Sequence, residues 1–122
     1  TPQFKCPQSN DLYTTATSTK GNKALTYPIG LITADEVAYA GGVHGEINNN
    51  YYMVNNELFW TMSPFDSDSC AVVWLVYPDG GLGVGDVDRE AGVRPAINLK
   101  STAEIIDGGN GTLNNPYVIK VN

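Results

Sequence analysis

The chain has 122 residues, enough for one hydrophobic core, and 42% of them are hydrophobic, so a wholly disordered protein is not expected. Thirteen acidic residues against seven basic ones give a net charge of −6, and the basic residues are scattered. We therefore expect no nucleic acid partner, because phosphate binding requires clustered Lys and Arg.

The strongest local pattern predicts a short helix over about 33–40. Thr33 and Glu36 have the spacing of a capping box, in which each side chain accepts a hydrogen bond from the other residue's backbone N–H. Gly41 follows and predicts the end of the helix, because glycine readily adopts the left-handed conformation found at helix C-termini.

Strands and turns are predicted for nearly all of the chain after this helix. Five segments have the composition and length of strands: 57–62, ending at Ser63-Pro64, then 71–77, 82–87, 93–99 and 117–121. Pro78-Asp79-Gly80-Gly81 predicts a tight turn, and 14–26 and 48–56 are predicted loops. We therefore expect a single α+β domain over 1–122, with a small antiparallel sheet, one or two short helices and long ordered loops.

Several features of the chain fit a secreted protein. Lysine is sparse, while Asn, Thr, Ser, Gly and Tyr are frequent. The chain opens at Thr1-Pro2 without a signal-peptide series, as a processed end does, so we expect that a targeting or anchoring segment was removed. No run of 18 apolar residues occurs, so no direct membrane insertion is expected from this segment. Cys6 and Cys70 form either a disulfide, worth about 4 kcal/mol, or two separate thiols.

Patterns for catalysis or metal binding are weak. His44 is the only histidine and no G-x-S-x-G frame surrounds a serine, so a surface or structural role is favoured over a catalytic base. Aspartates at 66 and 68, and at 86 and 88, offer oxygen ligands to calcium, but neither pair continues into a twelve-residue calcium loop. We therefore favour the interpretation that these aspartates are solvated surface carboxylates. No cofactor is expected, and a role for calcium stays open.

The apolar segment 71–77 has no polar residue on either face. In a regular strand, side chains alternate, which places Trp74 on one face with Val72 and Val76 and puts Tyr77 on the other. Two interpretations stay open: a central strand covered on both sides, or a strand with one face serving as a dry binding patch.

Three segments in fixed order carry a resemblance to a known family: YPIGLITADE at 27–36, FWTMSP at 59–64 and GVRPAINLK at 92–100. Over about 4–120 the chain resembles bacterial surface domains with a C-type-lectin-like, or formylglycine-generating-enzyme-like, fold. Members are often appended to type IV pilin-like segments. The resemblance implies an extracellular or cell-surface location.

Between the last two segments the family varies, and 63–91 resembles the target region of diversity-generating retroelements, in which rewritten template adenines randomise ligand-contacting residues. By position, the implied framework is Ala71, Val73, Val76, Gly80, Leu82, Val87 and Gly92. The implied variable positions that we do not assign to ligand contact are Cys70, Leu75, Gly81, Gly83 and Ala91. The implied ligand-binding residues are Phe65, Asp66, Asp68, Val72, Trp74, Tyr77, Asp79, Val84, Asp86, Asp88 and Glu90.

Two details follow from this assignment. Cys70 falls among the variable positions, which disfavours a structural bridge to Cys6. The framework at 71, 73 and 76 departs from strict alternation, which a β-bulge near Trp74 or Leu75 would explain.

We therefore expect a ligand-binding or adhesion module with aromatic anchors at Trp74, Tyr77 and Phe65, ringed by carboxylates that favour a basic or hydroxyl-rich partner. The partner would be a protein or glycan on another cell or surface, with pilus subunits as a further possibility. Truncating Trp74 is expected to remove binding and leave stability nearly unchanged. The alternative is a structural minor-pilin head without a ligand site. No enzyme is expected, because formylglycine chemistry needs paired reactive cysteines and Cys6 and Cys70 form no such motif.

Overall fold

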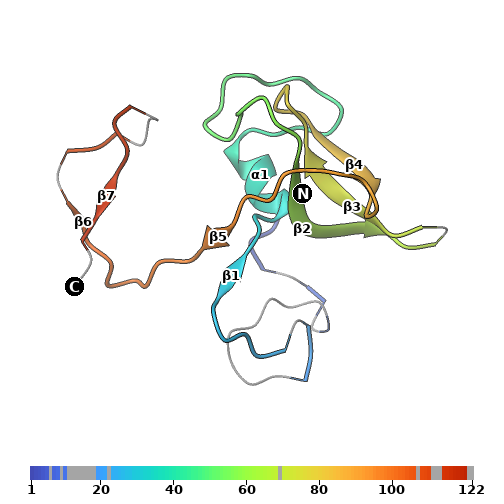
Figure 1. Cartoon of the computed structure of the whole chain (residues 1–122), viewed down its shortest axis with the longest axis horizontal. Helices are drawn as coiled ribbons and strands as arrows, with labels where there is room; N and C mark the ends of the chain where they lie inside the picture. Colours follow the sequence, from blue (N-terminus) through green and yellow to red (C-terminus); the bar gives the residue numbers. More distant parts are fainter. Residues whose placement is uncertain are drawn as a thin grey trace.

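The computed structural model describes residues 1–5, 7–8, 10, 19–21, 23–68, 70–106, 108–110 and 114–120. Within these residues the chain forms a small α+β arrangement of one short helix and seven mostly short strands, all paired antiparallel. The strands form one three-stranded sheet and two two-stranded sheets (Figure 1). The α+β class expected from the sequence is confirmed.

The helix, α1, spans Ala34–Ala40 and begins where its cap predicts. The Thr33 Oγ1 accepts a hydrogen bond from the Glu36 N–H at 3.1 Å, and the Glu36 carboxylate accepts one from the Thr33 N–H at 2.8 Å. Gly41, with φ of +126°, ends the helix by donating its N–H to the Val37 and Ala38 carbonyls. The predicted helix is confirmed.

The main sheet has the order β2–β3–β4, with β2 over Phe59–Asp66, β3 over Val72–Val76 and β4 over Leu82–Asp86. The predicted turn joins β3 to β4: Gly80 donates its N–H to the Tyr77 carbonyl, and Tyr77 donates its N–H to the Gly81 carbonyl, both at 2.9 Å. Gly80 has φ of +79°, the left-handed geometry that such a turn requires.

The predicted end of the strand at Ser63-Pro64 is wrong, because β2 runs through Pro64 to Asp66. Between Trp60 and Pro64 β2 advances four residues while β3 advances two, and a second shift lies between Pro64 and Asp66. Proline is tolerated at such irregular places because its missing N–H is not needed for the ladder. The pairing of β3 with β4 is regular from Val72 to Val76, so β3 itself has no bulge at Trp74 or Leu75. The irregularity is in β2, opposite the stretch of β3 between Val73 and Leu75.

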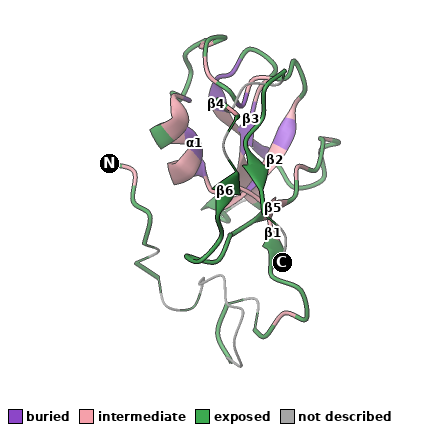
Figure 2. Ribbon diagram, turned by 90° about the vertical axis from the view of Figure 1, so that its left-hand side faces the viewer, coloured by how far each residue is buried: buried purple, intermediate pink, exposed green. Residues whose placement is uncertain are grey.

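The core lies between α1 and one face of the sheet (Figure 2). Val37 and Val76 are fully buried, and Phe59 and Leu82 lie beside them. Met53 is also buried, although it belongs to the asparagine-rich segment 48–56 that the sequence predicts as a loop. That segment contains no strand or helix, but its Met53 side chain forms part of the core.

Segments without regular structure border both edges of the main sheet. Beside β4, Leu82 donates its N–H to the Val43 carbonyl and accepts from the Gly45 N–H, both at 3.1 Å. Beside β2, Gly92 accepts from the Trp60 N–H at 3.0 Å and donates to the Leu58 carbonyl at 2.8 Å. The three strands are thereby flanked at the ends nearest the core.

The other two sheets are short and exposed. They pair β1 (Ile29–Gly30) with β5 (Ala96–Ile97), and β6 (Ile105–Ile106) with β7 (Val118–Ile119). The predicted strands at 93–99 and 117–121 therefore shrink to two described residues each, and β1 and β6 were not predicted. Figure 1 shows the β6–β7 hairpin well apart from the main sheet. No helix in the described part of the chain is long and apolar enough to cross a membrane.

Tyr51 joins the segment 48–56 to the β3–β4 turn. Its hydroxyl donates to the Gly80 carbonyl at 2.8 Å, and the Asn48 N–H donates to the Asp79 carbonyl at 3.1 Å. Burial raises the pKa of Tyr51 from its ordinary value of 10.0, and the nearby Arg94 partly opposes that rise. Tyr51 therefore stays a neutral donor at physiological pH.

Replacing Gly80 tests how much the fold depends on this junction. A Cβ at Gly80 would collide with the Asn48 carbonyl oxygen, whereas Gly45, with a similar φ of +75°, has no described atom within 4 Å of its added Cβ. Gly45→Ala should lower the free energy of unfolding by about 1–2 kcal/mol through backbone strain alone. Gly80→Ala should lower it by about 3 kcal/mol or more, measured by urea denaturation. Equal losses for the two variants would show that the close approach to Asn48 is unimportant.

Candidate functional site

One face of the main sheet is buried at one end and open at the other. Cross-strand partners share a face, and their pairing places Phe59, Val76 and Leu82 in a buried row beneath α1. The next row along β3 and β4 is Trp74 beside Val84, and the last is Asp66, Val72 and Asp86. We define the open face as the residues of these two outer rows together with Phe65: Phe65, Asp66, Val72, Trp74, Val84 and Asp86. All six are half-buried or exposed.

Aromatic rings meet at the centre of the open face. The Trp74 ring lies 5.1 Å from the Phe65 ring and 5.0 Å from the His44 ring, both in edge-to-face geometry. Trp74 also packs against the core, while Phe65 is 52% exposed. The register shift between Pro64 and Asp66 accounts for the direction of Phe65, because a bulge turns one side chain of a strand toward the other face.

Carboxylates border the aromatic rings. Asp66 accepts hydrogen bonds from the Ser67 and Asp68 N–H groups at 2.7 and 3.1 Å, and Asp86 accepts one from the Cys70 thiol at 3.2 Å. Neither carboxylate has a cationic partner, because the only ion pair in the described part of the chain joins Lys120 to Glu104. The open face is therefore apolar at its centre and negative at its border.

The expected aromatic anchors do not share one surface. Tyr77 lies on the opposite face of the sheet from Trp74, with its ring against Gly83. Its hydroxyl accepts from the Arg89 guanidinium at 3.3 Å and donates to the Val84 carbonyl at 3.4 Å. Tyr77 therefore cannot contact the same small ligand as Phe65 and Trp74.

The remaining expected site residues are exposed and lie outside the open face. Asp79 is in the β3–β4 turn, Asp68 is between β2 and β3, and Asp88 and Glu90 follow β4. Cys6 lies outside the described residues, so the two alternatives for Cys6 and Cys70, a disulfide or two separate thiols, both stay untested. No group of three or more His, Cys, Asp or Glu in the described part of the chain is placed to hold a metal ion.

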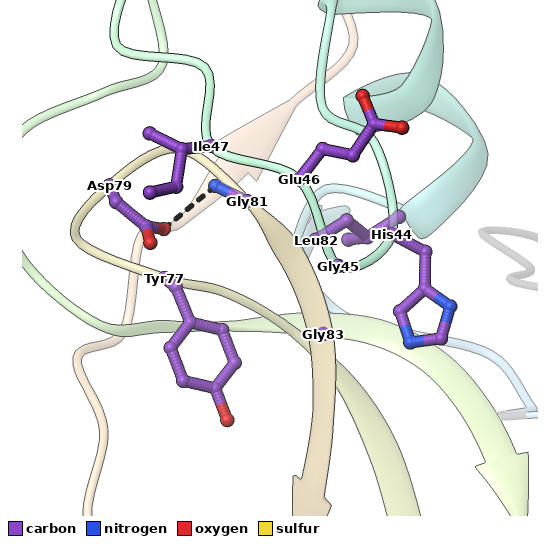
Figure 3. A pocket seen from close by; sticks show the side chains of 9 residues that line it. All are labelled: His44, Gly45, Glu46, Ile47, Tyr77, Asp79, Gly81, Leu82 and Gly83. Carbon is purple, nitrogen blue, oxygen red and sulfur yellow. Dashed lines mark hydrogen bonds between the residues drawn. The ribbon is translucent and has the colours of Figure 1, made fainter.

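A cleft of about 280 Å³ lies at the outer edge of β4 (Figure 3). Its lining joins the expected Tyr77 and Asp79 to His44, Glu46 and Ile47, which sequence reasoning did not assign to a site. The glycines at 41, 42 and 45 signal that the chain bends there. Nothing in the sequence indicates that the segment then returns to the edge of a strand almost forty residues later.

A second cavity of about 240 Å³ lies at Leu31, Trp60, Thr61, Val73 and Val87. Its lining is mainly apolar and contains no charged residue. Its polar side-chain groups are the Trp60 indole N–H and the Thr61 hydroxyl, and the latter already donates to the Trp74 carbonyl at 2.8 Å.

A double-mutant cycle measures how far Trp74 belongs to the fold. Because Trp74 packs on the core, Trp74→Ala should lower the free energy of unfolding by about 2–3 kcal/mol, in place of the near-zero change expected from the sequence. Combined with Phe65→Ala, the cycle should give a coupling of about 0.5–1.5 kcal/mol from the edge-to-face pair. Additive losses in urea denaturation would show that the two rings do not interact in solution.

Comparison with known proteins gives no relative for this chain: no protein-family profile, no curated protein and no solved structure matches it.

Proposed function

We propose that this chain is an extracellular ligand-binding module with a C-type-lectin-like fold, which holds a protein or glycan through its open face. The observation that carries the proposal is the pair of contacting rings, the exposed Phe65 and the half-buried Trp74, on a sheet whose other end is buried. Aromatic residues dominate the energetics of many binding sites because each supplies a large contact area.

The open face is held rigidly before any ligand arrives. Trp74 belongs to the central strand, and its ring is fixed between His44, Phe65 and the core. A ligand therefore has few side chains to immobilise, which lowers the entropic cost of binding.

The charges on the open face favour a basic or hydroxyl-rich ligand. Asp66 and Asp86 border the rings on two different strands and have no cationic partner among the described residues. Such carboxylates accept hydrogen bonds from sugar hydroxyls and attract Lys or Arg of a protein. They also repel acidic partners.

We further propose that the open face is the part of this module that a diversity-generating retroelement rewrites. Apart from Trp74, which packs against the core, its side chains are absent from the buried core, so most of them can change without unfolding the chain. Leu75 and Gly81 fit this role poorly. Leu75 is fully buried, and a Cβ at Gly81 would lie 2.8 Å from the Glu46 carbonyl oxygen. Both belong with the framework.

A structural role in a pilus is the second candidate, and a different observation favours it. The strands of the two small sheets expose apolar side chains, among them Ile29, Ile97, Ile105 and Val118. Such residues suit packing between subunits of a filament. In this case longer chains would self-associate at high concentration, and changes on the open face would not affect the assembly.

Binding by the open face is tested with one exposed ring. The labelled domain is screened against printed glycans and intact bacterial cells, and the best target is titrated. Phe65→Ala should weaken binding at least about thirtyfold, which corresponds to about 2 kcal/mol, while the loss of its contact with Trp74 lowers the melting temperature by only a few degrees. The control is Tyr117→Ala, whose ring is similarly exposed at 56% but lies next to β7, and it should bind as the wild type does. Equal losses for both variants, or none for Phe65→Ala, would contradict the assignment.

Diversification is tested by sequencing the coding segment from many individuals of the natural population. Substitutions should concentrate at the open-face positions, while Leu75, Val76, Gly80, Gly81 and Leu82 stay constant because they are buried or crowded. Substitutions spread evenly over the chain, or absent from 65–86, would exclude retroelement diversification and leave ligand binding itself to the Phe65 experiment.

A further inference from the structure

The outer edge of β4 is only partly covered. Val43 and Gly45 pair with Leu82, and the segment then leaves the strand. The backbone bonds of Gly81 to Tyr77 and of Val87 to Ala71 fix the alternation of the ladder, so the N–H and carbonyl of Val84 point away from β3. In the part of the chain that is described, no backbone group pairs with the Val84 N–H, while the Val84 carbonyl accepts a hydrogen bond from the Tyr77 hydroxyl at 3.4 Å.

We propose that this edge binds an extended, positively charged peptide segment, which adds a strand beside β4 through the main chain of Val84. The site goes beyond the function proposed for the open face, because it uses backbone hydrogen bonds and faces a different direction. An unpaired strand edge is a template for such an addition, and the pairing of Leu82 with the segment at 43–45 shows that this edge accepts a further strand.

The cleft at this edge gives the peptide its charge preference. Glu46 and Asp79 line the cleft, no Lys or Arg does, and the Asp86 carboxylate is exposed at the end of β4. Figure 3 shows the His44 and Tyr77 rings on either side of β4 near Gly83. On the Tyr77 side the Arg89 guanidinium already donates to the Tyr77 hydroxyl at 3.3 Å. A Lys or Arg side chain of the added strand therefore enters on the His44 side, where the Glu46 carboxylate attracts it.

A second copy of this chain is a poor occupant of the same edge. Edge-to-edge pairing of two β4 strands would bring Glu46, Asp79 and Asp86 toward the same carboxylates of the other copy. The net charge of −6 adds to this repulsion. The acidic edge therefore discourages self-pairing and selects a basic partner.

The probe is a hexapeptide of alternating Lys and Val, titrated into the labelled full chain and followed by NMR and fluorescence polarisation. The largest shifts should fall on Val84, His44 and Gly45, and the Val84 amide should become protected from exchange. A peptide with the same charge but N-methylated central residues should bind at least tenfold more weakly, because it cannot form the ladder. A Glu–Val peptide should also bind at least tenfold more weakly.

Variants of the chain test the same contacts. Val84→Pro replaces an open-face side chain and removes an N–H that points away from β3, but it removes no hydrogen bond of the β3–β4 ladder, so the fold should persist while binding falls at least tenfold. Val93→Pro, at an exposed valine next to the Gly92 bridge on the opposite edge of the sheet, is the control and should bind as the wild type does. Glu46→Gln should weaken binding of the Lys–Val peptide severalfold. If Val84→Pro fails to fold, the comparison of the Lys–Val peptide with its N-methylated form still tests the proposal, because both peptides are titrated into the unchanged chain.

Three results would overturn the proposal. One is the absence of binding up to about 1 mM peptide at low salt. Another is binding that N-methylation does not weaken, with shifts centred on Phe65 and Trp74, which would assign the peptide to the open face. The third is a concentration-dependent dimer with a protected Val84 amide in the absence of peptide, which would assign the edge to a second copy.

Discussion

The close approach of the Asn48 carbonyl to the backbone of Gly80 is the contact on which the rest of the structure depends. Only a residue without a side chain fits there, and its positive φ completes the β3–β4 turn at the same time. The contact holds the segment 43–54 against the sheet, which brings Met53 into the core and Tyr51 over the turn. Because that segment then leaves β4 after Leu82, the same contact also determines where the cleft and the open edge begin.

Trp74 connects the buried core to the open face, because it packs against both the core and Phe65. Its neighbours along β3 show the gradient: Val76 is fully buried beneath α1, Trp74 is half-buried, and Val72 lies between two exposed aspartates. A single strand thus passes from core to surface within five residues. Changes at the outer row leave the core intact, whereas changes at Trp74 would affect folding as well as the proposed ligand contact, so the side chains of this face are not equally free to vary.

Local signals in the sequence predicted local structure well. The capping box at Thr33 and the turn at Pro78-Asp79-Gly80-Gly81 depend on residues next to one another, and both were confirmed. The path of β2 through Pro64, the two-residue strands and the cleft depend on pairing between distant segments, which no short pattern encodes. The alternation of side chains along a strand already predicts that Trp74 and Tyr77 lie on opposite faces. The prediction that both residues anchor one ligand is inconsistent with that alternation.

The described residues after Gly85 include none that is buried, although they make up more than a quarter of the chain. The β6–β7 hairpin is held by its own ladder and by the exposed ion pair of Lys120 with Glu104, and such a hairpin opens readily by itself. A protease would therefore cleave the β6–β7 hairpin before it cleaves α1 or the main sheet. Resistance to proteolysis is thus expected in α1 and the main sheet, and early cleavage toward the carboxyl terminus.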